Sequence, residues 1–247
     1  MKKSVEIVIP AYNEEKQLRE SVLKLATFLN TELRKFIWKI TIADNASTDG
    51  TLGVAKELTK ENKNIHVLHL DLKGRGRAVK KAWKESSADY VGDTDVDLST
   101  DLKSLLNLLD GLEKGYDISI GSRLLPGAKV VGRTLRREIM SRVYNIIIKI
   151  FFQTHFSDAQ CGFKFVNKRV MKELLPYIRD DAWFFDSEML IVGEKLGFKI
   201  YEKAVHWVDD PGSTVRVMGT VKGDLLGLWR LFKDRPWNQI RKIAPEV

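Results

Sequence analysis

The sequence is short of cysteine and of long apolar runs. Its 247 residues include one cysteine, Cys161, which excludes an intrachain disulfide and fits a reducing compartment. A membrane-spanning helix needs roughly 20 mostly apolar residues, whereas the best run, residues 143–152, is much shorter and contains Lys149. The first apolar stretch, 5–10, is broken by Glu6 and lacks the features of a signal peptide. We therefore expect a cytoplasmic protein without a membrane span.

Repeats and low-complexity tracts are absent too, and the composition is that of a globular protein. Hydrophobic residues make up 44% of the chain, enough for a core, and the length suits one large α/β domain or two small ones. The net charge of +8 favours anionic partners such as phosphates, nucleic acid or acidic lipid, although solubility alone could account for it. Because the cations are spread along the chain, nucleic acid is not predicted as a partner.

The first 120 residues alternate short stretches rich in Val and Ile with stretches of helical periodicity. Strands are predicted at 5–9, 39–43, 65–70, 89–91 and 116–120, and helices at 14–29, 51–61, 76–86 and 101–114. This alternation predicts an α/β fold with a mainly parallel sheet covered by helices on both faces. From about residue 121 the alternation breaks down. We expect 121–232 to be the second half of the same domain and 233–247 to be a C-terminal tail.

Polar segments follow each of the first four predicted strands. In open parallel sheets ligands bind beyond the carboxyl ends of the strands, so four polar loops at that rim predict a binding site there. Turn and cap residues at strand ends are the alternative explanation. The segments contain Pro10, Tyr12 and Glu14, then Asp44 to Gly50, then Lys73 to Arg77, then Asp93 to Asp97.

The fourth loop carries three carboxylates, Asp93, Asp95 and Asp97, at alternate positions. On an extended strand such residues share one face, where their charges repel unless a cation neutralises them. Oxygen ligands alone suit Mg²⁺ or Mn²⁺, which take one or two carboxylates together with phosphate oxygens of a substrate. The loop therefore predicts a metal site, with an acidic turn as the alternative.

The third loop contains Gly74 and Gly76 flanked by Lys73, Arg75 and Arg77, just before a predicted helix. Free backbone amides and nearby cations at a helix start suit a phosphate. The segment is neither a Walker A loop nor the dinucleotide fingerprint, which has Gly where this chain has Val79. Asp44, which closes the second strand, could accept hydrogen bonds from a base or ribose, or could form an Asx-turn.

Taken together, these segments closely resemble the family 2 glycosyltransferases of the GT-A fold, whose domain is Rossmann-like. Further motifs resemble the dolichyl-phosphate mannose and glucose synthases of that family, and the resemblance covers roughly residues 4 to 232. The broader motifs are Pro10-Ala-Tyr-Asn-Glu14, Asp44-Asn-Ala-Ser-Thr-Asp-Gly-Thr51, Lys73-Gly-Arg-Gly76 and Asp95-Val-Asp-Leu-Ser99. The narrower ones are Gly121-Ser-Arg123, Arg137 with Ser141, Asp158-Ala-Gln-Cys-Gly-Phe-Lys164, Phe185-Asp-Ser-Glu188 and Trp207-Val-Asp-Asp-Pro-Gly-Ser213.

The resemblance implies a division of labour along the chain. Residues 1–120 would bind the nucleotide sugar and 121–232 the acceptor, with amphipathic helices at 136–156 and 216–232 lying in a membrane interface or packing as core helices. Pro10, Tyr12, Glu14, Asp44, Lys73 and Gly74 would bind the donor nucleotide. Asp95 and Asp97 would hold the metal and the diphosphate. The acceptor phosphate would be bound by Arg123, Arg137, Ser141 and Arg216. Asp186 and Glu188 would act in positioning.

The chain departs from the family pattern in three places. The second acidic motif usually begins Asp-Asp-Gly-Ser, where this chain has Asn45 and Ala46, and the mannose synthases commonly have Gln where this chain has Ser99. Ser99, with the motifs at 160–162 and 207–213, favours UDP-glucose over GDP-mannose as the donor.

The implied reaction is transfer of a hexose to a polyprenyl or dolichyl phosphate, with inversion, by a peripheral protein at the cytosolic face of a membrane. A phosphate acceptor needs no strong general base, which fits the absence of an obvious catalytic histidine; His66 and His69 fall in a strand and are interpreted as structural. Two alternatives remain. One is a glycosyltransferase with a soluble or polysaccharide hydroxyl acceptor, for which Asp186 or Glu188 would be the base. The other is a non-catalytic nucleotide-sugar or nucleic-acid binding module.

Overall fold

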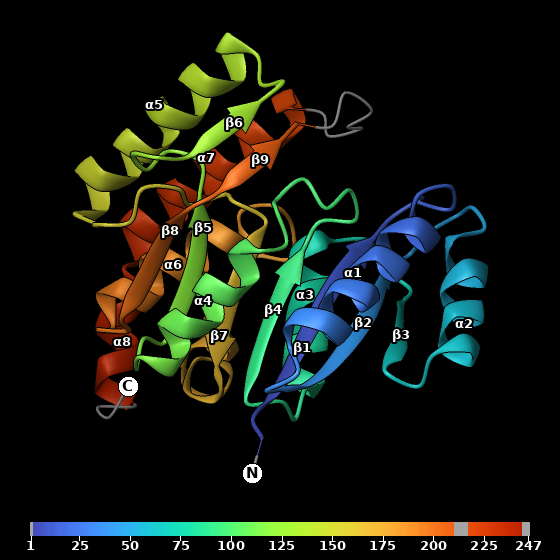
Figure 1. Ribbon diagram of the computed structural model, residues 1–247. Helices are drawn as coiled ribbons and strands as arrows, with labels where there is room; N and C mark the ends of the chain where they lie inside the picture. Colours follow the sequence, from blue (N-terminus) through green and yellow to red (C-terminus); the bar gives the residue numbers. More distant parts are fainter. Residues whose placement is uncertain (1, 210–216, 244–247) are drawn as a thin grey trace.

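The structure, a computed structural model, describes residues 2–209 and 217–243, without the side chains of 217–219 and 243. Its centre is a seven-stranded sheet in the order β3-β2-β1-β4-β7-β5-β8 (Figure 1). All neighbours are parallel except β7, which is antiparallel to both β4 and β5. The strands are β1 (Ser4–Ala11), β2 (Ile37–Asn45), β3 (Ile65–Leu70), β4 (Tyr90–Thr94), β5 (Ile118–Ser122), β7 (Phe163–Asn167) and β8 (Ile200–Ala204).

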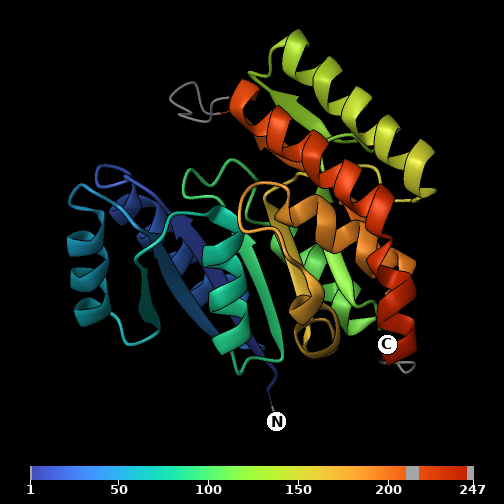
Figure 2. The ribbon, with the colours of Figure 1, turned by 180° about the vertical axis from the view of Figure 1, so that it is seen from behind.

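Helices cover both faces of this sheet, as the sequence predicts. One core joins the sheet to α1 (Leu18–Glu32), α2 (Thr51–Glu61) and α4 (Ser104–Glu113), which lie in front in Figure 1. A second core joins the opposite face to α3 (Arg75–Glu85) and α6 (Phe185–Lys195), with α7 (Val217–Asp234) and α8 (Pro236–Ile243) beside them (Figure 2). The predicted GT-A architecture, a mainly parallel α/β sheet between helices, is therefore confirmed.

Local boundaries agree closely with the sequence pattern in the first half. The strand 65–70 and the helix 51–61 are found at the predicted residues. The first helix begins later than predicted, at Leu18, because residues 14–17 form a turn in which the amide of Gln17 donates to the carbonyl of Glu14 (3.1 Å). The antiparallel β7 between β4 and β5 has no counterpart in the predicted alternation.

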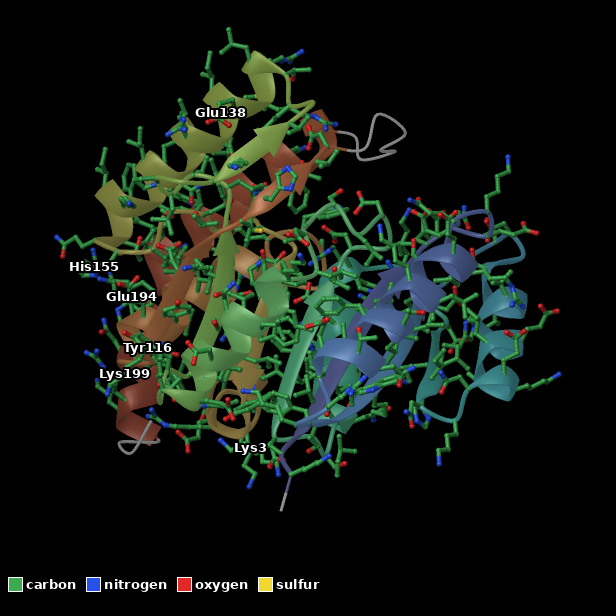
Figure 3. The ribbon with its side chains drawn as sticks, viewed as in Figure 1. Lys3, Tyr116, Glu138, His155, Glu194 and Lys199 are labelled. Carbon is green, nitrogen blue, oxygen red and sulfur yellow. The ribbon has the colours of Figure 1, made fainter. Side chains whose placement is uncertain are left out.

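A smaller layer lies over the carboxyl end of β5 and β8. Strands β6 (Lys129–Val131) and β9 (His206–Val208) pair in parallel, and helix α5 (Leu135–Phe152) runs beside them as the outermost element (Figure 1). In Figure 3, Glu138 marks the first turn of α5, and His155 and Glu194 lie near its far end. Strand β9 carries this layer to the loop after β4, since Val208 and the following Asp209 line the same hollow as Asp97.

The C-terminal segment contributes to the core. Trp237 and Ile240 of α8 are 9% and 3% exposed and pack in the same cluster as α6 and α7. The predicted tail 233–247 thus contains a helix that packs on the domain. None of the helices in the described residues is long and apolar enough to cross a membrane.

Candidate active site

The first two polar loops are joined to each other by hydrogen bonds. The amide of Asn13 donates to Ser47 Oγ (3.1 Å), and the Asn13 side-chain oxygen accepts from the amide of Thr48 (2.8 Å). The amide of Glu14 donates to Thr51 Oγ1 (2.8 Å). These bonds hold the loop after β1 against the loop after β2, so the predicted nucleotide-binding residues of both loops share one rim.

The third loop adds its cation to that rim. Lys73 Nζ lies 3.3 Å from the centre of the Tyr12 ring, an arrangement that attracts the ammonium to the aromatic face. Lys73 is exposed and Tyr12 is half-buried. Two residues that are 61 positions apart in the sequence are therefore neighbours at the ends of β1 and β3.

The predicted use of the glycine loop for phosphate binding is not supported by its hydrogen bonds. The amide of Gly74 donates to Asn45 Oδ1 (2.6 Å), and those of Gly76 and Arg77 donate to the carbonyls of Ala182 and Asp181 (both 3.0 Å). A Cβ on Gly74 would come within 2.4 Å of the Asp181 carbonyl oxygen. The glycines thus allow close packing on the 180–182 segment, and these three amides already have protein partners.

Asp44 is fully buried at the end of β2. Its Oδ2 lies 2.6 Å from Nδ1 of His69, which is adjacent to it on β3, and its Oδ1 is buried without a hydrogen bond. The side chain of Asp44 is 0% exposed, whereas that of His69 is 43% exposed. A direct contact between Asp44 and a base stays a prediction, and the structure shows that His69 is the more accessible member of the pair.

The acidic fourth loop is organised around Arg75, the first residue of α3. Its guanidinium is buried and lies 2.7 Å from Asp93, 3.2 Å from Asp95 and 2.9 Å from Asp186. The three predicted carboxylates therefore do not share one face of a strand: β4 ends at Thr94, and Asp93 points inward to Arg75. Burial raises the pKa of Asp93 to about 6, even though Arg75 opposes this rise.

The predicted positioning carboxylates are both interior. Asp186 is also 3.1 Å from Nζ of Lys164, a fully buried lysine on β7. Glu188 accepts from the amides of Arg179 and Asp180 (3.1 and 2.7 Å) and pairs with Arg230 of α7 (2.9 Å). Neither carboxylate is presented to solvent, and each ties α6 to another element.

Asp95 and Asp97 are the accessible carboxylates of the loop. The Asp95 side chain is 32% exposed, and Asp97 lines a hollow of about 450 Å³ between α1, this loop and β9. No group of three potential His, Cys, Asp or Glu ligands occurs in the described part of the chain. Two accessible carboxylates suit a hard divalent cation that takes its other ligands from a diphosphate and water. The residues present therefore fit Mg²⁺ or Mn²⁺, and Asp95 and Asp97 stay its predicted protein ligands.

A second charged cluster lies at the end of β5. Arg123 forms two side-chain hydrogen bonds with Asp158 (2.8 and 3.0 Å) and lies over the Trp207 ring (4.9 Å). Asp158 is fully buried, which alone would raise its pKa, but Arg123 outweighs this effect and lowers the pKa to about 2. The Arg123 guanidinium is thus fixed in direction rather than free to move.

Two further arginines lie near the start of α5. Arg137 pairs with Asp209 (3.1 Å) and is one-third exposed. Arg133 is nearly buried, and its Nη1 lies 3.1 Å from Glu138 in an ion pair that lacks hydrogen-bond geometry. Burial, together with the nearby Arg123, lowers the pKa of Arg133. Ser141 follows one turn after Arg137 on the same helix. Arg216, the fourth predicted acceptor residue, lies outside the described residues.

One segment connects the carboxylate and arginine clusters. Asp158 holds Arg123, and four residues later Gly162 abuts Asp95, where a Cβ would come within 2.1 Å of the Asp95 carboxylate. The attraction of Asp95 also contributes to raising the pKa of Arg123. The site therefore places a carboxylate pair that can hold a metal diphosphate beside cations that can hold a second phosphate.

Four residues of the site escape the sequence interpretation: Arg75, His69, Asp158 and Lys164. The sequence pattern places Arg75 among the phosphate cations because it flanks a glycine, and it indicates a structural role for His69 because that residue falls in a strand. Asp158 and Lys164 belong to a recognised motif without an assigned role. Arg75 pairs with Asp93, 18 residues away in the sequence, and with Asp186, 111 residues away. Local spacing does not reveal such partners.

Comparison with known proteins identifies the family. The sequence profile of glycosyl transferase family 2 matches residues 6–175. The chain belongs to glycosyl transferase family 2. This family 2 glycosyltransferase is 30% identical over 237 residues to the glycosyltransferase AglD of Haloferax volcanii, covering 94% of the chain but only 38% of AglD. It is 29% identical over 219 residues to the dolichyl-phosphate beta-glucosyltransferase of Dictyostelium discoideum, covering 84% of the chain and 67% of that protein.

Solved structures support the fold of the family 2 glycosyltransferase. Glucosyl-3-phosphoglycerate synthase from Mycobacterium tuberculosis, in complex with Mn²⁺, UDP and glucosyl-3-phosphoglycerate, superposes with a TM-score of 0.68 at 15% identity. The match covers 93% of this chain and 80% of that one. The same enzyme with Mn²⁺, UDP-glucose and phosphoglyceric acid gives a TM-score of 0.69 at 13% identity.

Proposed function

We propose that this family 2 glycosyltransferase transfers a hexose, with inversion, from a nucleotide sugar to a polyprenyl or dolichyl phosphate, with UDP-glucose as the favoured donor. The observation that carries the proposal is the segment from Asp158 to Gly162, which joins the carboxylates of the donor side to the arginines of the acceptor side. The names of the curated relatives support the acceptor class and the glucosyl group.

On the donor side, the nucleotide would lie across the ends of β1, β2 and β3. Pro10, Tyr12, Glu14 and Lys73 are at this rim, next to the buried Asp44 and to Gly74. Asp95 and Asp97 would hold Mg²⁺ or Mn²⁺ with the diphosphate. When bound, the cation would supply charge neutralisation for the leaving nucleotide diphosphate. The Mn²⁺ in the structural neighbours' complexes supports a divalent ion of this kind.

On the acceptor side, the arginine cluster would bind the phosphate by charge-assisted hydrogen bonds. Arg123 and Arg137 are oriented by Asp158 and Asp209, so their guanidiniums are already aligned before the acceptor arrives. Ser141 would donate from its hydroxyl, and Arg216 is proposed as a further cation. A neutral hydroxyl acceptor would not need this concentration of positive charge.

The chemistry is a displacement at the anomeric carbon. A phosphate oxygen of the acceptor forms the new bond while the bond from the anomeric carbon to the β-phosphate oxygen of the donor breaks, and attack from the opposite face inverts the configuration. The phosphate is already ionised, so no base has to remove a proton. The burial of Asp186 and Glu188 in ion pairs supports this reaction over one in which either acts as a base for a hydroxyl.

The acceptor's lipid tail points to a membrane surface, and α5 and α7 supply an apolar stripe for it. The two helices lie side by side (Figure 2), and Phe151 of α5 contacts Phe232 of α7 edge to face. Apolar helix faces with basic neighbours bind at lipid interfaces. We propose peripheral binding to the cytosolic face of a membrane through this stripe, which comprises Leu135, Ile139, Val143, Ile146, Ile150, Phe151, Leu225, Leu226, Trp229 and Phe232, all exposed.

A transfer assay tests the donor and metal parts of the proposal. The protein is incubated in detergent with polyprenyl phosphate, Mg²⁺ or Mn²⁺, and labelled UDP-glucose or GDP-mannose. We expect lipid-linked glucose, reduced by about 10²-fold or more in Asp97→Asn and little changed in the control Asp101→Asn, an exposed residue of the same hollow. Product from GDP-mannose alone would overturn the donor assignment. Full activity of Asp97→Asn would overturn the role of the carboxylate pair.

A further inference from the structure

The side chains of Asp44 and His69 differ in their exposure to solvent, and this difference indicates which of the two meets a ligand. The two residues are directly opposite each other on β2 and β3, at the rim where the nucleotide is proposed to lie. The carboxylate is enclosed by the protein, whereas 43% of the side chain of His69, its hydrogen-bond partner, is exposed. A planar base arriving at these strand ends would meet His69 before Asp44.

The hydrogen bond to Asp44 also fixes what the outer nitrogen of His69 can do. A carboxylate oxygen only accepts hydrogen bonds, so the 2.6 Å contact places the ring proton on Nδ1. In a neutral imidazole with that proton position, Nε2 is an acceptor. Nε2 lies 3.8 Å from the exposed Asp71, beyond hydrogen-bonding distance. With the imidazole neutral, the pair offers one outward-facing acceptor, held in a defined direction.

We propose that His69, oriented by Asp44, is the residue that recognises the base of the donor and selects uracil. This inference rests on the proposed function, because it requires a nucleotide at this rim. Uracil presents a single donor, N3–H, between two carbonyl acceptors, and one imidazole nitrogen satisfies it. Guanine presents two adjacent donors, so a single acceptor leaves its 2-amino group without a partner, which costs affinity. Cytosine and unmodified adenine present an unprotonated ring nitrogen, which Nε2 cannot satisfy.

Neighbouring residues suit the rest of the base. Lys73 follows β3, the strand that carries His69, and this exposed side chain, with its ammonium over the Tyr12 ring, can donate to a uracil carbonyl. Asp44 then acts as a positioning residue: its buried carboxylate sets the tautomer and direction of the imidazole rather than touching the base. The simpler alternative is that His69 only supplies a hydrogen bond to a buried carboxylate.

Two substitutions separate these alternatives, because each keeps one end of the imidazole. In His69→Asn the amide can replace Nδ1 and bond Asp44, but nothing remains at the position of Nε2. In His69→Gln the side-chain oxygen can reach the position of Nε2. If His69 were merely structural, Asn would be the better replacement; if it recognises the base, Gln would be.

The experiment is calorimetric titration of the protein, in the presence of Mn²⁺, with UDP, GDP and 3-methyl-UDP, in which N3 carries a methyl group instead of hydrogen. We expect the wild-type protein to bind UDP about tenfold or more tightly than the other two. His69→Asn should lose this preference and His69→Gln should keep most of it. The control His66→Asn, an exposed histidine of the same strand, should behave as wild type.

The outcomes distinguish this inference from the proposal on which it rests. If the wild type prefers UDP and His69→Asn keeps both its affinity and its preference, the role of His69 is overturned while the nucleotide site stands. Tighter binding of GDP than of UDP by the wild type overturns the selection of uracil. If the wild type binds none of the three nucleotides, the proposed function itself fails and this inference fails with it.

Discussion

At the scale of single residues, Ala46 shows the cost of a departure from the family pattern. It adopts a left-handed conformation with φ of 59°, in the loop where the family usually has glycine. A left-handed non-glycine residue costs roughly 1–2 kcal/mol, whereas glycine costs about 0.5–1 kcal/mol in chain entropy. We expect Ala46→Gly to stabilise the protein by about 0.5–1 kcal/mol, seen as a rise of about 2 °C in thermal denaturation. Ala128→Gly, at a position without positive φ, should give no such rise; an unchanged or lower melting temperature for Ala46→Gly would show that the strain is absent.

Arg75 is the residue on which the carboxylate cluster depends. In Arg75→Met, the buried Asp93 and Asp186 and the partly exposed Asp95 would lose their shared cation, and breaking a buried ion pair costs about 3–5 kcal/mol. In the folded protein the pKa of the Asp93 carboxyl is raised to about 6. Its contribution to the stability of the folded state is therefore fully present below the pKa that Asp93 has in the unfolded chain. That contribution is lost as the pH rises through about 6. We therefore expect a larger loss at pH 8 than at pH 5 in urea unfolding.

The matched control for Arg75 is on the same helix. Arg77 pairs with Asp181, and both side chains are about one-third exposed or more, so Arg77→Met should cost less than about 1 kcal/mol, with little dependence on pH. Equal losses for the two variants would contradict the assignment of Arg75 as the centre of the cluster.

At the scale of elements, helix α7 carries a buried acid on its inner face. Asp224 is 5% exposed, and burial raises its pKa to about 6 despite a hydrogen bond from Gln160. A raised pKa in an acid means that its contribution to stability is present at low pH and is lost as the pH rises through the folded pKa. Asp224→Asn should therefore gain more over wild type at pH 8 than at pH 4.5, by about 2 kcal/mol, measured by urea unfolding. The exposed Asp234→Asn on the same helix is the control, and an equal gain at both pH values would contradict the buried charge.

The elements also show how far the sequence can predict this molecule. The strands and helices of the first 120 residues follow from hydrophobic periodicity, because each is specified by neighbours in the chain. The insertion of β7 between β4 and β5 depends on pairings between residues 44 or more positions apart, and hydrophobic periodicity holds no information about such pairings.

The same limit applies within the site. The rim of Tyr12, Lys73, Asp95 and Asp97 follows from the rule for parallel sheets, because all four residues follow strands that end at one edge. The use of the Gly74 and Gly76 amides by the 180–182 segment could not be inferred, because it requires knowing which distant loop packs there. The inward direction of Asp93 has the same cause, since Arg75 sets it.

At the scale of the whole molecule, the apolar stripe on α5 and α7 should govern membrane binding. We expect co-sedimentation with vesicles containing anionic lipid, weakened by salt because the net charge of +8 contributes. Ile150→Glu, in the stripe and 69% exposed, should reduce the bound fraction severalfold, because it places a charge at the lipid contact. Ile37→Glu, 62% exposed at the start of β2, matches it in chemistry and exposure and should bind as wild type. Equal binding by both variants, or no binding by the wild type at any salt, would contradict the stripe as the membrane surface.

The central claim is that the acceptor is a phosphate, bound by the arginine cluster beside the metal-binding carboxylates. The most direct test is to offer the purified protein labelled UDP-glucose with either polyprenyl phosphate or the corresponding free polyprenol, in the same detergent and with Mn²⁺. The account predicts a glucosylated product from the phosphate and none from the alcohol. The alcohol lacks the charge that the arginines bind, and Asp186 and Glu188, buried in ion pairs, are not placed to remove its proton. Product from the free alcohol at a comparable rate would contradict it.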